Sequence, residues 1–309
     1  MKKVLVTGGA GYIGSSLIPW FLHDHKVTVI DSLMYDKTSL LPYLTHKNFE
    51  FVKGDVRDTK LLTKLVNDAD IIVPLAALVG FPLCRDDERG AVEINATANT
   101  FIASIKQPNQ IVVYPCTNSG YGNANAGEVC TEESPMTPIT LYGTTKVDAE
   151  KAFIATPGCT TLRLATVYGP SPRMRSDLLI NNFTLKAMKE KALVLYEDSF
   201  KRNYVHIQDV CAAFRFVVDN WAECKDQVFN VGNDALNCTK MELAKQIAEV
   251  IPCEIYVNEN FKDPDKRDYI VSSQKIYDLG FECKIDLKTG IKQVQSAYDI
   301  LDEPWYANY

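Results

Sequence analysis

Directly after its first apolar run, at residues 4–6, the chain reads Thr7-Gly8-Gly9-Ala10-Gly11-Tyr12-Ile13-Gly14. The glycines fit both G-x-G-x-x-G and G-x-x-G-x-x-G, and a helical pattern follows them. Glycines so spaced allow a tight turn and a close backbone approach, so that a pyrophosphate can lie at the positive N-terminus of a helix. Similar triplets occur in ordinary turns, but a strand before and a helix after favour a dinucleotide site.

Asp31 ends the next β-branched run, at the distance from the glycines where a carboxylate contacts a ribose. It would accept a hydrogen bond from the 2′-hydroxyl and repel a 2′-phosphate. The residues that follow, Ser32, Leu33 and Met34, add no arginine. We therefore expect NAD rather than NADP. A glycine turn in an α/β fold that binds no nucleotide stays open as the alternative.

The alternation of short apolar runs and helical patterns predicts an α/β fold with a doubly wound parallel sheet of the Rossmann type. Its strands are expected at residues 4–6, 27–30, 49–52, 71–73, 111–113, 160–164 and 228–231. We expect an NAD-binding domain at 1–165 and about 202–233. A smaller, discontinuous α/β substrate domain would take about 166–201 and 234–309. One of its helices should begin at a capping box of Thr239 and Glu242, with an apolar stripe behind it.

The composition narrows the class of protein. Among 309 residues, 39 are acidic and 33 basic, and a net charge of -6 disfavours nucleic acids and anionic membranes as partners. The nine cysteines form no C-x-x-C pair and, with four histidines, offer no metal-ligand cluster. No apolar run approaches the roughly 18 residues that span a bilayer. We expect a cytoplasmic enzyme or small-molecule binder without a metal.

Tyr142 and Lys146 stand four residues apart, on one face of an expected helix. A tyrosine with a pKa near 10 is a poor base at neutral pH, but a neighbouring ammonium and a positive nicotinamide stabilise its phenolate. Such a pair can remove the proton of a substrate alcohol while hydride leaves the carbon. Alone, the spacing is equally typical of an exposed helix.

Several motifs occur together in one order, and the set resembles the extended short-chain dehydrogenase/reductase family, the nucleotide-sugar epimerases and dehydratases. They are the glycine loop, Asp31, Gly54-Asp55-Val56-Arg57-Asp58, Leu75-Ala76-Ala77, Thr117, Tyr121-Gly122, Tyr142 with Lys146, and residues 163–170. The resemblance covers essentially the whole chain. It implies a catalytic set of Thr117, Tyr142 and Lys146. It also implies that NAD is held by Gly8, Gly11, Tyr12, Ile13, Gly14, Asp31, Asp55, Val56, Leu75, Ala76, Ala77, Tyr142 and Lys146.

Positions 118 and 119 separate the branches of that family. The 4,6-dehydratases carry an acid and a base there, and the 3,5-epimerases and fucose-type synthases carry a cysteine at the second position. Asn118 and Ser119 do neither kind of work. The chemistry that remains is oxidation at C4 of the sugar, with or without return of the hydride.

Residues 74–80, 117–122, 171–175 and 263–269 more closely resemble the GDP-heptose 4-dehydrogenases of capsule polysaccharide synthesis. That resemblance implies a GDP-linked heptose and a 4-keto product. A 4-epimerase of the UDP-sugar type and a non-catalytic NAD-binding sensor stay open. By resemblance the chain should also form a homodimer, through the helix of Tyr142 and one at about 92–105.

The expected substrate residues are the polar groups of these segments. An acidic chain needs local cations for a diphosphate, and guanidinium groups match phosphate oxygens. The set is Asn118, Ser119, Arg173, Arg175, Asn181, Asn182, Arg202 and Arg267. Arg202 and Arg267 most resemble pyrophosphate ligands, whereas Arg173 and Arg175 could equally be solvated loop charges.

Overall fold

The computed structural model describes residues 1–35, 38–123, 128–258 and 268–301. Its strands are β1 (Lys3–Thr7), β2 (Lys26–Asp31), β3 (Phe49–Lys53), β4 (Ile71–Pro74), β5 (Ile111–Thr117), β6 (Val129–Cys130), β7 (Cys159–Leu164), β8 (Thr166–Tyr168), β9 (Ala192–Leu195), β10 (Lys201–His206), β11 (Val228–Val231), β12 (Asn233–Thr239), β13 (Glu254–Val257) and β14 (Ile270–Val271). Its α-helices are α1 (Tyr12–Leu22), α2 (Thr59–Asp68), α3 (Phe81–Asp86), α4 (Glu88–Ala91), α5 (Ala98–Ile105), α6 (Leu141–Ile154), α7 (Leu179–Lys189), α8 (Ile207–Asp219), α9 (Trp221–Cys224), α10 (Lys240–Val250), α11 (Gln274–Tyr277) and α12 (Leu287–Ile300). Two 3₁₀ turns, η1 (Leu41–Tyr43) and η3 (Asn118–Tyr121), and a π-helical stretch, η2 (Val92–Thr97), complete it.

Seven strands form the main sheet, in the order β11-β7-β5-β4-β1-β2-β3. Every neighbouring pair is parallel. The predicted doubly wound parallel sheet is confirmed, and all seven expected runs are strands of it. The strand order reverses between β1 and β4, and at such a point the carboxyl ends of the strands open a crevice that binds ligands.

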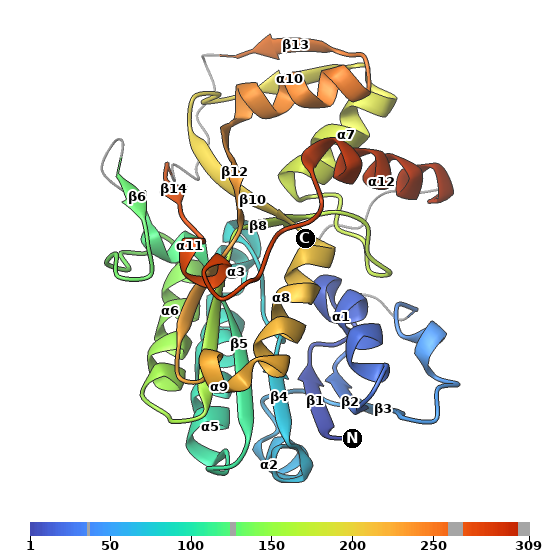
Figure 1. Cartoon of the computed structure of the whole chain (residues 1–309). Helices are drawn as coiled ribbons and strands as arrows, with labels where there is room; N and C mark the ends of the chain where they lie inside the picture. Colours follow the sequence, from blue (N-terminus) through green and yellow to red (C-terminus); the bar gives the residue numbers. More distant parts are fainter. Residues whose placement is uncertain (36–37, 124–127, 259–267, 302–309) are drawn as a thin grey trace.

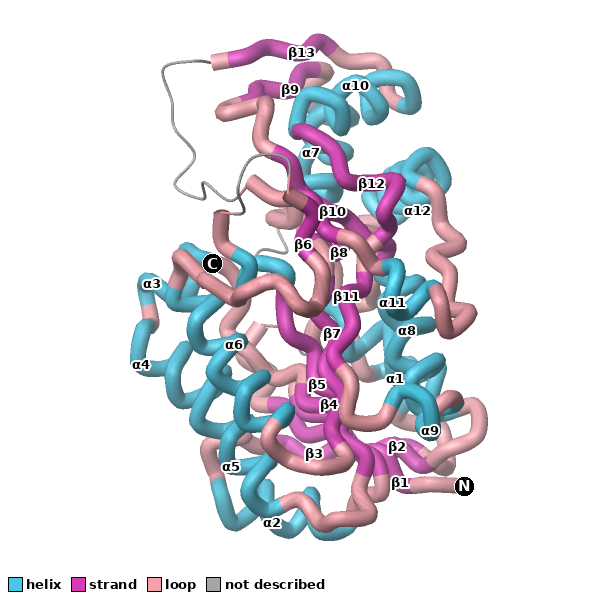
Figure 2. The backbone as a smooth tube through the Cα atoms, turned by 60° about the vertical axis from the view of Figure 1, so that its left-hand side comes forward, coloured by secondary structure: helices cyan, strands magenta, loops and turns pink. Residues whose placement is uncertain are grey.

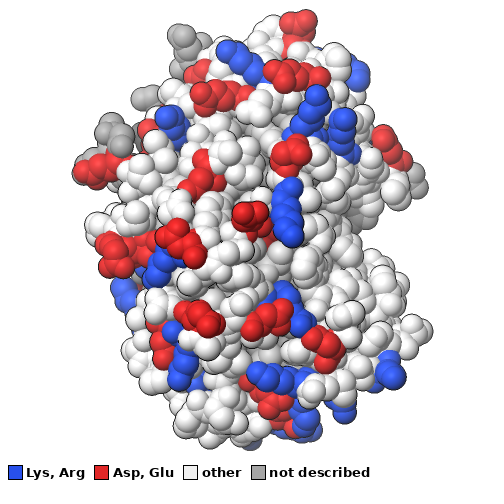
Figure 3. All heavy atoms as spheres, in the orientation of Figure 1, with Lys and Arg blue, Asp and Glu red and all other residues white. Residues whose placement is uncertain are grey.

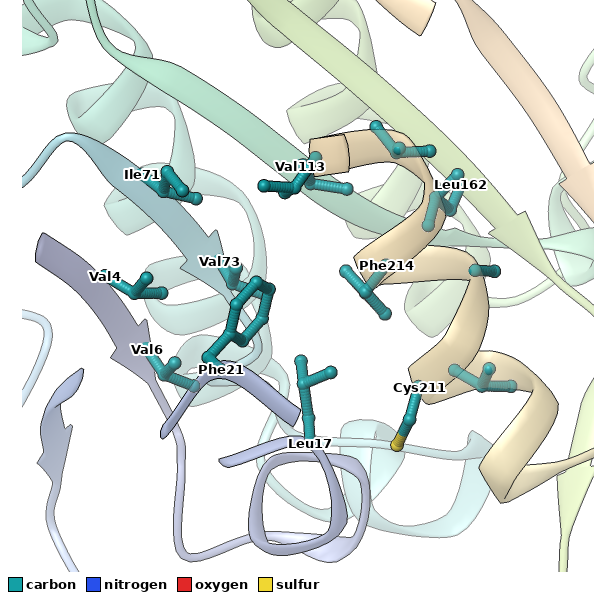
Figure 4. Packing of buried hydrophobic residues seen from close by; sticks show 14 of the residues in the cluster. Val4, Val6, Leu17, Phe21, Ile71, Val73, Val113, Leu162, Cys211 and Phe214 are labelled. Atoms are coloured by element: carbon teal, nitrogen blue, oxygen red, sulfur yellow. The ribbon is translucent and has the colours of Figure 1, made fainter. Parts of the chain in front are cut away.

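Helices cover both faces of this sheet. Figure 2 shows α2, α5 and α6 on one side and α1 and α8 on the other. Successive side chains of a strand point to opposite faces, so Val4 and Val6 pack with α1 and α8 whereas Leu5 packs with α2 and α5. In Figure 4, Phe21 of α1 and Phe214 of α8 pack with strand side chains on this same face of the sheet, among them Val73 and Val113. Burial of each such side chain contributes about 1.5–3 kcal/mol.

A second group of elements lies beyond the carboxyl ends of the sheet (Figure 1, top). It contains the β12-β10-β8 sheet, the β13-β9 pair and the helices α7, α10 and α12, with a hydrophobic core of their own. The predicted capping box is confirmed, since Glu242 N–H donates to Thr239 Oγ1 at 3.1 Å and Thr239 N–H donates to Glu242 Oε2 at 2.8 Å. Strand β10 pairs with β8 and β12, whereas α8, which follows it, packs on the main sheet. The chain therefore crosses between the two groups at residues 206–207.

The surface carries no single-sign charged area on the face shown in Figure 3, where acidic and basic side chains are interspersed. Within the described residues, no helix is long and apolar enough to cross a membrane. Among the residues that the structure describes, there is no group of three or more His, Cys, Asp or Glu side chains that could hold a metal ion.

Candidate active site

One cavity of about 320 Å³ runs along the carboxyl ends of the main-sheet strands. Most of the residues expected at the site line it: Gly8, Gly11, Tyr12, Ile13, Gly14, Asp31, Asp55, Val56, Leu75, Ala76, Ala77, Thr117, Ser119, Tyr142, Lys146, Arg173 and Arg175. They come from segments up to 167 residues apart. The fold thus brings the glycine loop and the expected catalytic set to one cavity.

The glycine loop is shaped by close backbone contacts. Gly8 has φ +69°, and a Cβ there would lie 2.6 Å from Cα and N of Ala76. A Cβ on Gly14 would lie 2.6 Å from Cα of Gly9, so α1 also packs directly against the loop. The N-cap of α1, Gly11, brings no side chain, and the first turn holds no acidic residue. The first N–H groups of this helix can therefore bind an anion, as a pyrophosphate requires.

Asp31 lies at the end of β2, between the glycine loop and the loop that follows β2. Its carboxylate accepts the N–H of Ala10 at 2.9 Å and that of Leu33 at 2.8 Å. Burial raises the pKa of Asp31, and these two hydrogen bonds oppose that effect. The carboxylate is fixed beside the glycines. A dinucleotide with its pyrophosphate on the glycine loop would have a ribose hydroxyl near this carboxylate. The cradle therefore fits an NAD dinucleotide.

The loops after β3 and β4 complete this wall of the cavity. Arg57 donates from Nη2 to Asp55 Oδ2 at 2.7 Å, and this contact lowers the pKa of Asp55. Ala76 N–H donates to Thr7 Oγ1 at 3.2 Å, which ties the loop after β4 to the end of β1. Val56 is buried and lines the same wall.

Tyr142 and Lys146 lie one turn apart on α6, whose N-cap, Thr140, accepts the N–H of Gly143 at 3.1 Å. Lys146 is 4% exposed, with Nζ 4.2 Å from the centre of the Tyr114 ring. Burial lowers the pKa of Lys146 to about 8, although Cys116 and Glu150 act in the opposite direction. The pair is thus a feature of the cavity and not of an exposed helix.

Thr117 ends β5 and caps the turn η3. Its hydroxyl donates to Ser119 Oγ at 3.0 Å and accepts the N–H of Ser119 at 3.1 Å. Asn118 is 1% exposed and does not line the cavity, and among the described residues neither its amide nitrogen nor its amide oxygen has a hydrogen-bond partner. The position that decides the branch therefore carries a buried, unpaired amide.

The expected substrate arginines differ in their surroundings. Arg173 and Arg175 are 2% and 8% exposed and line the cavity, so the alternative of solvated loop charges is wrong. Arg202 is buried on β10, with its guanidinium carbon 5.6 Å from the centre of the Tyr269 ring, and Tyr269 lines the cavity. Arg267 lies outside the described residues.

Asn181 and Asn182 do not line the described cavity. Asn181 accepts the N–H of Gly169 at 3.0 Å and donates to the carbonyl of Arg175 at 2.9 Å. Asn182 donates to the carbonyl of Ser176 at 3.1 Å. In this structure both amides hold the backbone of the segment that carries Arg173.

Comparison with known proteins agrees with this geometry. Residues 4–232 match the NAD dependent epimerase/dehydratase family. The chain belongs to this family. It is 29% identical over 308 residues to the low-salt glycan biosynthesis protein Agl12 of Haloferax volcanii, covering 96% of this chain and 98% of that protein.

Solved structures of the family share the fold. The dTDP-glucose 4,6-dehydratase DesIV of Streptomyces venezuelae with NAD bound has a TM-score of 0.84 at 25% identity, over 96% of this chain and 97% of that one. The UDP-glucuronic acid 4-epimerase of Bacillus cereus, in complex with UDP-glucuronic acid and NAD, has a TM-score of 0.85 at 22% identity, over 96% and 99%. The protein is an NAD-dependent enzyme of the nucleotide-sugar epimerase and dehydratase type.

Two features of this family member were not predicted. Asn95 of η2 accepts the N–H of Leu78 at 2.8 Å and donates to the carbonyl of Leu78 at 2.9 Å and to Thr145 Oγ1 at 3.3 Å, which fixes the loop after β4 against α6. Glu150, one turn after Lys146, forms a buried ion pair with Arg163 of β7 at 3.1 Å. Of these residues only Arg163 carries a sequence signal, as a charged residue between Leu162 and Leu164 in a buried strand.

Proposed function

We propose that this enzyme oxidises C4 of a nucleotide-diphosphate sugar with NAD and releases the 4-keto sugar, with a GDP-linked heptose as substrate. The observation that carries the proposal is the joint position of Thr117, Tyr142 and Lys146 on the cavity that the glycine loop also lines. Membership of the family supports NAD and a nucleotide sugar. The heptose rests on the resemblance of four segments, of which residues 263–267 lie outside the described part.

The chemistry asks little of the protein beyond proton transfer and orientation. Bound NAD would supply the acceptor for the hydride of C4. Thr117 holds the C4 oxygen by a hydrogen bond, and Tyr142 as phenolate takes the hydroxyl proton. The ammonium of Lys146 stabilises the phenolate. The carbonyl forms as the C4–H and O–H bonds break, with the hydride and the proton leaving to separate acceptors.

The loop after β5 supports oxidation without dehydration. Loss of water across C5 and C6 needs one group to protonate the leaving hydroxyl and another to take the C5 proton. Neither Asn118 nor Ser119 has a proton to give or take in the required range. We therefore do not propose for this chain the 4,6-dehydratase activity of relatives such as the dTDP-glucose 4,6-dehydratase of Streptomyces niveus.

A 4-epimerase is the second candidate, because the same three side chains would serve it and the fold also matches a UDP-glucuronic acid 4-epimerase. The two activities differ in one respect: in an epimerase the keto sugar rotates in the cavity and takes the hydride back on its other face.

We also propose that the elements around the β12-β10-β8 sheet bind the nucleotide sugar, through Arg202 and Tyr269, while the main sheet binds NAD. A homodimer would form through α5 and α6, near the 43%-exposed Val92.

The test is to incubate the enzyme and NAD with GDP-heptose and with UDP- and dTDP-hexoses, and to follow the products by NMR. A 4-keto heptose with one reduced cofactor per sugar is expected. An inverted sugar with no net reduction of cofactor would favour the epimerase, and a 6-deoxy product would contradict both. Turnover that survives Tyr142→Phe would show that another group takes the proton, whereas NAD binding without turnover of any of these sugars would favour the non-catalytic sensor.

A further inference from the structure

The segment after β8 is tied to the first turns of α1. Ser171 Oγ donates to the carbonyl of Tyr12 at 2.7 Å and lies 3.1 Å from Ser15 Oγ. The N–H of Arg173 donates to Ser15 Oγ at 3.3 Å. Arg173 is therefore anchored at the end of α1 where the family binds a dinucleotide diphosphate.

The side chain of Arg173 is also held on the cofactor side. Its guanidinium carbon lies 5.4 Å from the centre of the Tyr35 ring, and Nη1 donates to the carbonyl of Met174 at 2.8 Å. Tyr35 stands four residues after Asp31, and both line the cavity. Stacking on an aromatic ring fixes the plane of a guanidinium, which then loses less entropy on binding phosphate.

The charges along the cavity call for a cation at this place. Its charged lining residues within the described chain are Asp31, Asp55, Lys146, Arg173 and Arg175. Lys146 belongs to the catalytic end, and Arg173 is the arginine whose backbone N–H is hydrogen-bonded to Ser15 in the first turns of α1. A diphosphate bound beside the carboxylate of Asp31 would be repelled by it unless a guanidinium compensates.

We propose that Arg173, oriented by Tyr35, pairs with the diphosphate of bound NAD. This moves Arg173 from the expected substrate residues to the cofactor residues. The two diphosphates that the enzyme handles then have separate arginine–tyrosine pairs: Arg173 with Tyr35 for NAD, and Arg202 with Tyr269 for the nucleotide sugar. The proposal rests on NAD as cofactor and not on the sugar, so a different sugar substrate would leave it intact.

The test compares Arg173→Met with Arg89→Met, which removes the same charge from a side chain that is 89% exposed. The affinity for NADH is measured by titration calorimetry, and ADP-ribose and adenosine are measured as competitors of NADH. Arg173→Met should weaken NADH and ADP-ribose by about 10- to 100-fold, the usual effect of losing a charge-assisted hydrogen bond. The affinity for adenosine, which has no phosphate, should change by less than about twofold. In Arg89→Met the affinities for all three ligands should likewise change by less than about twofold.

Two further variants keep the test decisive. Arg173→Lys retains the charge without the planar fork, and we expect it to lose NADH affinity to an intermediate degree. It carries the test if Arg173→Met does not fold. Tyr35→Leu removes only the stacking ring and should weaken NADH by about threefold. Unchanged NADH affinity in the Arg173 variants would overturn the proposal. So would an equal loss for adenosine, or a loss for free UDP, GDP and dTDP with NADH unaffected, since Arg173 would then serve the substrate.

Discussion

The two ends of the cavity are built on different principles. The cofactor end depends first on close backbone packing, in a loop where Gly8 approaches Ala76 so closely that a Cβ would lie 2.6 Å away. The reaction end is made of side chains, namely Thr117 and the pair Tyr142 and Lys146, held on β5 and α6. A backbone site tolerates only glycine, so it is shared across reactions, whereas a side-chain site can be changed one residue at a time. The difference explains how one fold supports several reactions on nucleotide sugars.

Removing the expected base should break the reaction end alone. Tyr142→Phe should lower turnover by at least about 100-fold, because the phenol is the proton acceptor. The affinity for NADH should fall far less than turnover, because the glycine loop and Asp31 are unchanged and the ring of residue 142 is kept. Steady-state kinetics and a binding titration on the same protein check both. Near-normal turnover would show that another group takes the proton.

A methyl group in the glycine loop should break the cofactor end. Gly8→Ala combines a positive φ with a backbone clash. It should lower the unfolding free energy by about 3 kcal/mol and should abolish measurable NAD binding. Gly280→Ala is the matched control, because Gly280 has φ +95° but nothing within 4 Å of a Cβ. It should cost about 1 kcal/mol and leave NAD binding intact. If Gly8→Ala and Gly280→Ala lowered the free energy of urea unfolding equally, the close approach of Gly8 to Ala76 would be contradicted.

The buried charge of Lys146 should make the reaction end costly to fold. Its pKa falls from 10.5 to about 8 on folding, which at 1.36 kcal/mol per pH unit amounts to about 3 kcal/mol. Below pH 8 both states are protonated and the whole penalty is present. Between pH 8 and 10.5 the folded state loses its proton first, so the penalty fades and stability rises.

Without NAD, Lys146→Met should therefore exceed the wild type in stability most below pH 8, and the difference should shrink by up to about 3 kcal/mol toward pH 10.5. Denaturant unfolding across this range measures it. A difference that does not change with pH would contradict a depressed pKa.

The smallest effect is expected far from both ends. Thr239→Ala removes the capping box of α10 and should lower stability by about 1 kcal/mol. NADH affinity and turnover should not change, because α10 packs in the separate core above the sheet. A loss of NADH affinity in this variant would show that the two cores are coupled.

Much of the cofactor end could be predicted from the sequence, because its features are local. The glycine loop follows a strand within a few residues, and the seven main-sheet strands are short runs rich in β-branched and apolar residues. The capping box of α10 is likewise a pattern four residues long.

What the sequence did not reveal depends on contacts between distant segments. Arg173 contacts Ser15 across 158 residues, and no spacing rule links the two. Asn95 and the Glu150–Arg163 pair act through neighbours on other elements. Asn118 was expected beside the substrate, but its burial without a partner is visible only in the fold.

The most direct test of C4 oxidation without dehydration follows a deuterium label placed on C4 of the nucleotide sugar. The position of the label after reaction with NAD is read by NMR and mass spectrometry. We predict a 4-keto product that has given its label to the cofactor and keeps its C6 hydroxyl. Deuterium found at C6 of a 6-deoxy product would contradict the account, because a dehydratase moves the label there.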